Sequence, residues 1–228
     1  MENLIKEKIT AIVPALNEET TVGNVLSILL GSKCLDEVIL VDDGSSDKTA
    51  EIGEKLGVKV VKLPKIGGSG KGNAMRQGAM ATNAKIIVFF DADLLGLTTK
   101  HVDSLVIPVS SGQVSMCVGI RNRLFGLPKI IARLDPIMAV GGERAIRKEL
   151  FEKIPDKFMH GFMVESALNY YCKYYKIPVK YAVLENLKIV IKEKKWGFVK
   201  GFVSRIKMMF EIFKIRSIFI FYNFKNRS

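Results

Sequence analysis

The chain has 228 residues, of which 48% are hydrophobic and 25% charged, values typical of a globular protein with one substantial α/β domain. A formal net charge of +12 favours anionic partners, such as phosphorylated substrates, an anionic membrane face or nucleic acid. The sequence has no ribonucleoprotein aromatic motif, zinc-finger spacing or low-complexity basic arm, so we expect no nucleic-acid partner.

The cysteines and the N-terminus indicate a cytoplasmic protein. Cys34, Cys117 and Cys172 are far apart and odd in number, which suits neither a metal site nor a disulfide framework. The first ten residues lack the apolar region of a signal peptide. No stretch reaches the roughly 20 apolar residues that a transmembrane helix needs.

Strand and helix patterns alternate through the first hundred residues. The elements predicted in chain order are a strand over 9–14, a helix over 22–30, a strand over 37–41, a helix over 49–56, a strand over 58–63, a helix over 73–84 and a strand over 86–90. Gly57 suits the end of the second helix. This order predicts a doubly wound, mostly parallel sheet that binds ligands at the carboxyl ends of its strands.

The second half is less regular. It predicts a helix over 101–109, a strand over 114–120, a tight turn at 141–145 before a helix that ends near Pro155, a helix over 163–175 and an extended segment over 178–190. There is no internal repeat and no linker rich in Pro, Gly or Ser, so residues 1–195 are expected to form one domain.

The C-terminal tail, residues 196–228, combines aromatic and basic side chains. Phe198, Phe202, Met209 and Phe213 fall near helical spacing, with lysines and arginines between them. This pattern is typical of an amphipathic helix on an anionic membrane surface. It equally suits a helix that packs on the domain or on the partner of a homodimer.

Two aspartates follow a strongly apolar run. Residues 86–90, IIVFF, read as a buried strand, and Asp91 and Asp93 follow at once. Burial of unpaired carboxylates is unfavourable, so packing does not explain them. Two carboxylates at the tip of a central strand suit Mg²⁺ or Mn²⁺ bound to a diphosphate.

Two further segments suit a nucleotide. Asp42 and Asp43 end the second strand, where a carboxylate can accept hydrogen bonds from a base or a ribose, while Ser45, Ser46 or Asp47 would cap the following helix. The glycine-rich loop 67–72 contains Gly70 and Lys71 and leads into a helix. Its backbone N–H groups predict a phosphate site, although no Ser or Thr follows the lysine as in a Walker loop.

These segments resemble the GT-A fold glycosyltransferases of family 2. V-P-A-L-N-E-E (13–19), V-D-D-G-S-S-D-K-T (41–49), G-K-G-N-A (70–74) and F-D-A-D-L (90–94) occur in the order and at the spacing of that family. The resemblance implies a nucleotide-diphosphate-sugar donor. The residues that it assigns to the donor site are Pro14, Ala15, Asn17, Glu18 and Asp43 at the nucleoside, Gly70 and Lys71 near the phosphates, and Asp91, Ala92 and Asp93 at the metal and diphosphate.

The second half is similar, more loosely, to the glucosyl-3-phosphoglycerate synthases and their mannosyl relatives. G-G-E-R-A (141–145), Pro155 and G-F-M-V-E (161–165) match their pattern, which implies that Glu165 contacts the sugar or the acceptor. That group has a histidine metal ligand after the helix. Here Lys192 falls at about that place, and our hypothesis is that it replaces part of the metal's charge.

The polyprenyl-phosphate sugar synthases, similar to dolichol-phosphate mannose synthases, share the first-half motifs and use a membrane lipid phosphate as acceptor. Arg121, Arg123, Arg133 and Arg144 suit a small phosphorylated acceptor or a lipid phosphate equally well. A protein of another class, which binds a nucleotide sugar at the membrane without catalysis, also stays open. A nucleotidyltransferase is disfavoured, because no G-x-G-x-R loop follows the first strand.

The sequence therefore predicts a metal-dependent hexosyltransferase that uses a nucleotide sugar and a phosphorylated acceptor. Lys71 and the metal held by Asp91 and Asp93 would stabilise the leaving diphosphate. An acceptor phosphate is already ionised and needs no base. If the acceptor reacts through a hydroxyl and the enzyme inverts, Glu165 is the candidate base.

Overall fold

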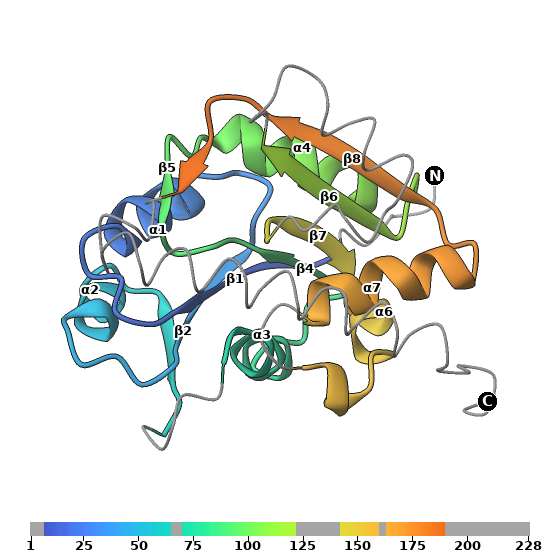
Figure 1. Ribbon diagram of the computed structural model, residues 1–228. Coiled ribbons are helices and arrows are strands. Elements are labelled where there is room, and N and C mark those ends of the chain that lie inside the picture. Colours follow the sequence, from blue (N-terminus) through green and yellow to red (C-terminus); the bar gives the residue numbers. More distant parts are fainter. Residues whose placement is uncertain (1–6, 65–69, 122–141, 160–162, 190–228) are drawn as a thin grey trace, which may run out of the picture.

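The computed structural model describes residues 7–64, 70–121, 142–159 and 163–189. Figure 1 shows an α/β fold in which helices flank a central sheet. The first-half elements are β1 (Ile9–Ala15), α1 (Val22–Leu30), β2 (Glu37–Asp42), α2 (Thr49–Lys55), β3 (Lys59–Lys62), α3 (Lys71–Met80), β4 (Ile86–Phe89) and β5 (Leu94–Leu95). The second-half elements are α4 (Thr99–Ser110), β6 (Met116–Arg121), β7 (Arg144–Arg147), α6 (Lys148–Glu152), a 3₁₀ helix (Asp156–Phe158), α7 (Met163–Tyr174), β8 (Val179–Leu184) and β9 (Lys188–Ile189).

The main sheet has seven strands in the order β3-β2-β1-β4-β7-β6-β8. β1 pairs in parallel with β2 and β4, β2 with β3, and β6 with β8. β7 alone in this sheet runs antiparallel to its neighbours, β4 and β6. The predicted doubly wound, mostly parallel sheet is therefore confirmed, and the carboxyl ends of its six parallel strands lie at one edge.

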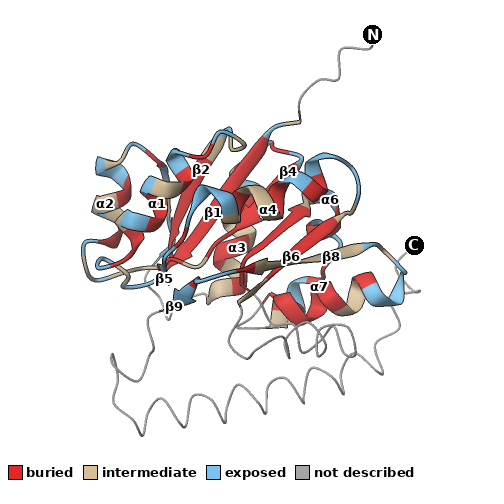
Figure 2. Ribbon diagram, turned by 90° about the horizontal axis from the view of Figure 1, so that it is seen from above, coloured by how far each residue is buried: buried red, intermediate tan, exposed pale blue. Residues whose placement is uncertain are grey.

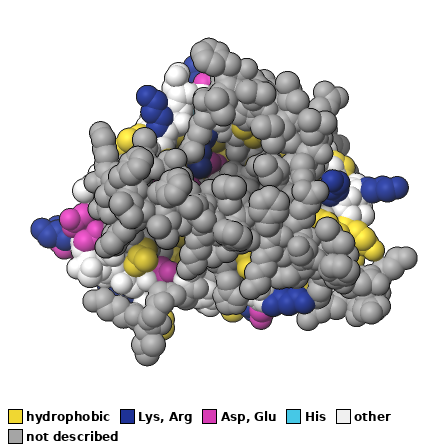
Figure 3. Space-filling view, viewed as in Figure 1, with side chains coloured by type: hydrophobic (Ala, Val, Ile, Leu, Met, Phe, Trp, Pro, Cys, Tyr) yellow, Lys and Arg dark blue, Asp and Glu magenta, His cyan; other side chains and the backbone are white. Residues whose placement is uncertain are grey.

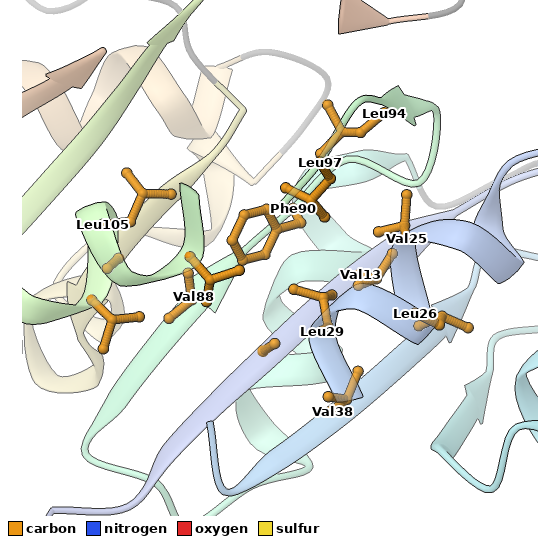
Figure 4. Packing of buried hydrophobic residues seen from close by; sticks show 14 of the residues in the cluster. Val13, Val25, Leu26, Leu29, Val38, Val88, Phe90, Leu94, Leu97 and Leu105 are labelled. Carbon is orange, nitrogen blue, oxygen red and sulfur yellow. The ribbon is translucent and has the colours of Figure 1, made fainter. Parts of the chain in front are cut away.

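Two apolar layers sandwich the sheet, and they explain why its strands read as continuous apolar runs. In β1, Val13 faces α1 and α4, whereas Ile12 faces α3 and α7. Figure 4 shows Val13, Leu29 and Phe90 packed together in the first layer. Complete burial of each such side chain contributes about 1.5–3 kcal/mol. Figure 2 shows that the central strands are buried along most of their length.

The predicted turn at 141–145 is wrong in part, because residues 144–147 form the strand β7. Arg144, Ala145 and Ile146 are buried between β4 and β6. A four-residue strand that begins and ends in arginine lacks the apolar run by which a buried strand is recognised. The helix expected next is present as α6, and it ends before Pro155.

The boundaries of two helices also differ from the prediction. α3 begins at Lys71 instead of residue 73, which places the lysine in the first turn of the helix, and it ends at Met80 instead of residue 84. α4 begins at Thr99 instead of residue 101 and ends at Ser110 instead of residue 109. Pro108 lies in its last turn, where a proline costs the helix only one hydrogen bond.

Several predicted features lie outside the described residues. These are the tail 196–228, Lys192, Arg123, Arg133, residues 67–69 of the glycine-rich loop, and Gly141, Gly161 and Phe162 of the second-half motifs. Among the residues that the structure describes, no helix is long and apolar enough to cross a membrane. The described part of the face in Figure 3 carries both basic and acidic side chains.

Candidate functional site

The ends of β1 and β2 form one side of the site. The Asp43 N–H donates to the Ala15 carbonyl at 2.8 Å, which keeps the two strands together beyond their last regular pair. The Asp43 carboxylate accepts a hydrogen bond from the Gly70 N–H at 3.0 Å. Asp43 is 5% exposed, and this contact ties the start of α3 to the end of β2.

The loops after β1 and β2 are joined through side chains. The Asn17 side-chain oxygen accepts from the Ser46 N–H at 2.8 Å, and the Asn17 N–H donates to the Ser45 hydroxyl at 2.9 Å. The Glu18 N–H donates to the Thr49 hydroxyl at 2.8 Å. The loops that carry Asn17, Glu18 and Asp43, predicted nucleoside residues, are thus brought together.

The capping alternative for the second loop is only partly right. Lys48 occupies the N-cap of α2, and no side chain bonds from that position. The serines predicted as caps bond to Asn17 instead. Asp47 does act near the helix start, where its carboxylate accepts from the Thr49 N–H at 3.0 Å.

Lys71 joins the two halves of the chain. Gly70, with φ at 78°, precedes it as the N-cap of α3, a backbone conformation that glycine adopts readily. The Lys71 ammonium lies 2.6 Å from Asp91 Oδ1 and 2.8 Å from Glu165 Oε1. Glu165 is 1% exposed on the first turn of α7. Burial alone would lower the pKa of Lys71, but the two carboxylates outweigh it and raise that pKa above its ordinary value.

Gly142 completes the surroundings of this ion pair. A Cβ atom at Gly142 would lie 2.6 Å from Asp91 Oδ2 and 2.8 Å from the Lys71 ammonium. Contacts this short are essentially never seen for real Cβ atoms. A larger residue at this position would therefore displace Asp91 or Lys71.

Glu143 and Arg121 form a second, more buried pair beside it. Glu143 is fully buried, and its Oε2 lies 3.7 Å from Arg121 Nε. Within the described part of the chain, neither carboxylate oxygen of Glu143 has a hydrogen-bond partner. Burial first, and the charge of Asp91 second, raise the pKa of Glu143 to about 7, against the opposing charges of Arg121 and Lys71.

Arg144 contacts the main chain of Glu165 from the protein interior. It is fully buried, and its guanidinium donates to the Glu165 main-chain carbonyl at 3.3 Å. Burial lowers the pKa of Arg144. Its burial argues against the predicted acceptor contact, and Arg144 instead holds the first turn of α7 against β7.

Comparison with known proteins identifies the family of this chain. The model of the family described as "Glycosyl transferase family 2" matches residues 10–171. The chain belongs to this family.

Curated relatives of this chain include glucosyl-3-phosphoglycerate synthases. The one from Petrotoga mobilis is 30% identical over 198 residues, which cover 70% of this chain and 59% of that protein. The one from Mycolicibacterium smegmatis is 30% identical over 197 residues, or 70% of this chain and 62% of that protein. The chain thus spans about three fifths of the length of these relatives, and the predicted resemblance is confirmed.

A solved structure is also similar to this chain. The glucosyl-3-phosphoglycerate synthase from Mycobacterium tuberculosis, in complex with Mn²⁺, UDP-glucose and phosphoglyceric acid, gives a TM-score of 0.67 at 28% sequence identity. The match covers 81% of this chain and 72% of that one. The GT-A fold predicted from the motifs is thereby confirmed.

The Asp-x-Asp motif formed by Asp91, Ala92 and Asp93 lies just past β4. Asp91 and Asp93 are partly exposed, whereas Ala92 is 3% exposed and packs in the core. Leu94, next to Asp93, is buried and pairs with Ile189 across the β5–β9 ladder.

The two aspartates fit a hard divalent cation. Within the described ranges, no three His, Cys, Asp or Glu residues lie close enough together to hold a metal. Mg²⁺ in phosphoryl sites is commonly held by one or two carboxylates, with substrate phosphates completing its shell. Two carboxylate side chains at the edge of the sheet meet that requirement.

Gly142 and Glu143 were not predicted as site residues. Nothing in their local pattern indicates proximity to Asp91, because the contact depends on the reversed direction of β7. The one available signal was the G-G-E-R-A motif, whose resemblance to the synthases marked the segment without giving its residues a role.

Proposed function

We propose that this chain transfers a hexose from a nucleotide-diphosphate sugar, of the UDP-glucose or GDP-mannose type, to a phosphorylated acceptor, as glucosyl-3-phosphoglycerate synthases do. The observation that carries the proposal is the junction of Lys71 with Asp91 and Glu165. In this junction, Lys71 of the predicted phosphate loop, Asp91 of the Asp-x-Asp motif and Glu165 of the second half lie together at the carboxyl edge of the sheet. The solved relative that is similar to this chain binds Mn²⁺, UDP-glucose and phosphoglyceric acid.

The donor would lie along this edge. The base and ribose would contact the loops that carry Pro14, Ala15, Asn17, Glu18 and Asp43. The diphosphate would approach the start of α3, where unpaired helix N–H groups and the helix dipole favour an anion. Gly70, without a Cβ, lets the diphosphate approach the backbone there.

In the reaction, the bond between the anomeric carbon and the diphosphate oxygen breaks, and an acceptor oxygen forms a new bond to that carbon. Lys71 would stabilise the negative charge that develops on the leaving diphosphate. Mg²⁺ or Mn²⁺, held by Asp91 and Asp93, would supply further positive charge there. Glu165, fixed through Arg144, would orient the sugar or the acceptor hydroxyl.

The acceptor phosphate would bind at Arg121. Arg121 ends β6 at the same edge, and its side chain is 12% exposed. A guanidinium can bind a phosphate through two parallel hydrogen bonds. Arg121 is therefore the described residue that we assign to the acceptor.

Ligand binding tests the donor half of the proposal. UDP-glucose, GDP-mannose, UDP and GDP are each added with and without Mn²⁺, and the melting temperature is measured. A ligand at a hundredfold excess over its Kd stabilises the native state by about 2.7 kcal/mol. We expect one nucleotide to give a shift that needs the metal. Absence of any shift would contradict the proposal.

Product analysis tests the acceptor. The preferred donor is incubated with 3-phosphoglycerate or with a polyprenyl phosphate in detergent, and the sugar phosphate product is identified by mass spectrometry. We expect transfer to 3-phosphoglycerate. Transfer to the lipid alone would support a polyprenyl-phosphate sugar synthase, and donor binding without transfer or hydrolysis would indicate a non-catalytic binding protein.

The roles predicted from the sequence for Lys192 and for the tail 196–228 are tested separately. If Lys192 replaces part of the metal's charge, Lys192→Ala should weaken donor binding and slow transfer, and unchanged values would exclude that role.

Vesicles of anionic phospholipid should retain the full chain if the tail binds membrane. A concentration-dependent mass in light scattering would instead favour a homodimer.

A further inference from the structure

The Lys71 ammonium group is closely surrounded by residues from three segments. Its nitrogen contacts Asp91 Oδ1 at 2.6 Å and Glu165 Oε1 at 2.8 Å. On another side it lies so close to Gly142 that no Cβ fits there. Three segments, the end of β4, the residues before β7 and the start of α7, thus surround one cationic group.

We propose that Lys71 is the resident counter-ion of the ligand-free site, and that the donor diphosphate draws it away, so that a divalent cation enters at Asp91 with the donor and not before it. This inference rests on the proposed function, since it concerns the same metal and diphosphate. It adds that the metal binds together with the donor and not before it, and it gives the charge of Lys71 as the cause of this order.

The ligand-free site needs a cation at this place. Glu165 is 1% exposed, and the fully buried carboxyl group of Glu143 lies within electrostatic range of Asp91. A buried carboxylate without a partner of opposite charge is strongly unfavourable. Lys71 supplies that charge from within the chain, so the site is stable without a metal ion.

The same contact opposes binding of a metal ion alone. One oxygen of Asp91 already binds the ammonium at 2.6 Å, and a divalent cation on this carboxylate would lie close to the positive charge of Lys71. The two cations repel one another at such a separation. The metal must therefore displace Lys71 or bind with a partner that attracts Lys71 elsewhere.

The donor diphosphate is such a partner. Lys71 is the first residue of α3, and its flexible four-carbon stem can turn toward an anion at the helix start while the backbone stays in place. The Gly70 N–H stays fixed by Asp43, so the helix start itself does not have to move. Once the ammonium has turned, it no longer occupies Asp91 Oδ1 and Glu165 Oε1, and its positive charge no longer opposes a cation at Asp91.

This exchange predicts that removal of the ammonium strengthens metal binding in the absence of nucleotide. Lys71→Met keeps most of the apolar stem and removes the charge. Mn²⁺ binding is measured by electron paramagnetic resonance, without nucleotide and with UDP. We expect Mn²⁺ alone to bind about tenfold more tightly to the variant than to the wild-type chain, within the range of coupling between sites in proteins.

The coupling between metal and nucleotide should also change. In the wild-type chain UDP should strengthen Mn²⁺ binding, and Mn²⁺ should strengthen UDP binding by the same factor. That factor should be smaller in Lys71→Met. Mn²⁺ alone should raise the melting temperature of the variant more than that of the wild-type chain, because the variant lacks its internal counter-ion.

A matched lysine provides the control. Lys55 pairs with Glu51 at 2.6 Å on the exposed side of α2, away from the site, so Lys55→Met should leave Mn²⁺ binding unchanged. Lys71→Gln replaces Lys71→Met if the latter does not fold. Mn²⁺ affinity that is equal to or weaker than wild type in the folded Lys71 variant would overturn the inference.

The proposed function fails by a different observation. A wild-type chain that binds no nucleotide under any metal condition would contradict the donor site. The measurement with Mn²⁺ alone would still decide whether Lys71 excludes the cation from Asp91.

Discussion

Phe89 on β4 pairs with Arg144 on β7, across an antiparallel boundary inside an otherwise parallel sheet. The reversal places the residues that precede β7 beside those that follow β4. Gly142 therefore approaches Asp91, and Glu143 lies beside it in the interior. A parallel strand in this position would have presented the residues that follow it, so the direction of β7 brings the second half of the chain to the Asp-x-Asp motif.

The aspartates of this motif should be indispensable. We expect Asp91→Asn and Asp93→Asn each to lower the rate of transfer at least about 10²-fold, because each removes a charge that would hold the metal at the diphosphate under the proposed function. The metal-dependent shift in melting temperature with nucleotide should also disappear. Asp156→Asn, at an exposed aspartate paired with Arg76, is the control and should leave both unchanged. Turnover near the wild-type rate in either site variant would exclude the assignment.

Gly142→Ala should impair catalysis without preventing folding. The added methyl would lie 2.6 Å from Asp91 Oδ2, so the carboxylate or Lys71 must shift. A displacement of about 1 Å can cost up to 10²-fold in rate, and we expect a loss of at least about tenfold in kcat. Gly31→Ala is the control, since its Cβ would meet no atom closer than 3.6 Å. Equal kcat values for the two variants would show that the site tolerates the methyl.

The first half of the chain was predictable because its signals are local. The apolar runs of β1, β2 and β4 carry the sheet, and the polar residues that follow them must lie at one edge once those strands are parallel. Between Asp91 and Asp93, Ala92 packs in the core, and its predicted donor contact stays a prediction.

The rest depends on contacts between distant residues. Lys71 and Glu165 are 94 positions apart, and no spacing rule connects them. Arg144 can be buried in a strand because it bonds to the Glu165 carbonyl, a partner that its own neighbours do not reveal. Charged residues in such a segment indicate a turn until the partner is known, which is why β7 was missed.

Glu37 should give the stability a dependence on acid pH. At the edge of the sheet away from the site, its Oε2 accepts from the Thr82 hydroxyl at 3.0 Å and the Thr10 hydroxyl at 3.1 Å and pairs with Lys8 at 2.9 Å. Burial works to raise the pKa of Glu37, but these hydrogen bonds outweigh it and lower that pKa below its ordinary value. A lowered folded pKa means that the carboxylate stabilises the fold above its unfolded pKa, near 4.5, and loses this effect as pH falls through the folded value.

Glu37→Gln tests this directly. At pH 7 we expect the free energy of unfolding to fall by about 1–3 kcal/mol, the contribution of hydrogen bonds to a charged group. The difference from wild type should shrink as the pH is lowered below 4.5, where the wild-type carboxylate becomes protonated. Urea unfolding at a series of pH values measures it. Glu51→Gln, on the exposed face of α2, should change little, and a Glu37→Gln difference that is constant with pH would refute the assigned charge.

His101 should hold in place the segment that pairs with the residues after Asp93. Its Nδ1 accepts from the Thr98 N–H at 3.2 Å, so the proton is on Nε2, which donates to the Glu185 carbonyl at 3.0 Å. This contact fixes residues 185–189, whose last residue pairs with Leu94, next to Asp93. His101→Ala should therefore loosen the β5–β9 ladder and, with it, the position of Asp93.

Hydrogen exchange followed by mass spectrometry measures this loosening. A hydrogen bond of about 1 kcal/mol corresponds to a roughly fivefold change in the opening equilibrium, so peptides that cover 94–97 and 185–189 should exchange about fivefold faster in His101→Ala. Metal-dependent binding of nucleotide should weaken in parallel. Ser110→Ala, at the other end of α4, removes a hydroxyl that bonds to the nearby Ile107 carbonyl and should leave both segments unchanged. Faster exchange with undiminished metal-dependent binding would show that the ladder does not position Asp93, and unchanged exchange would show that His101 does not hold the ladder.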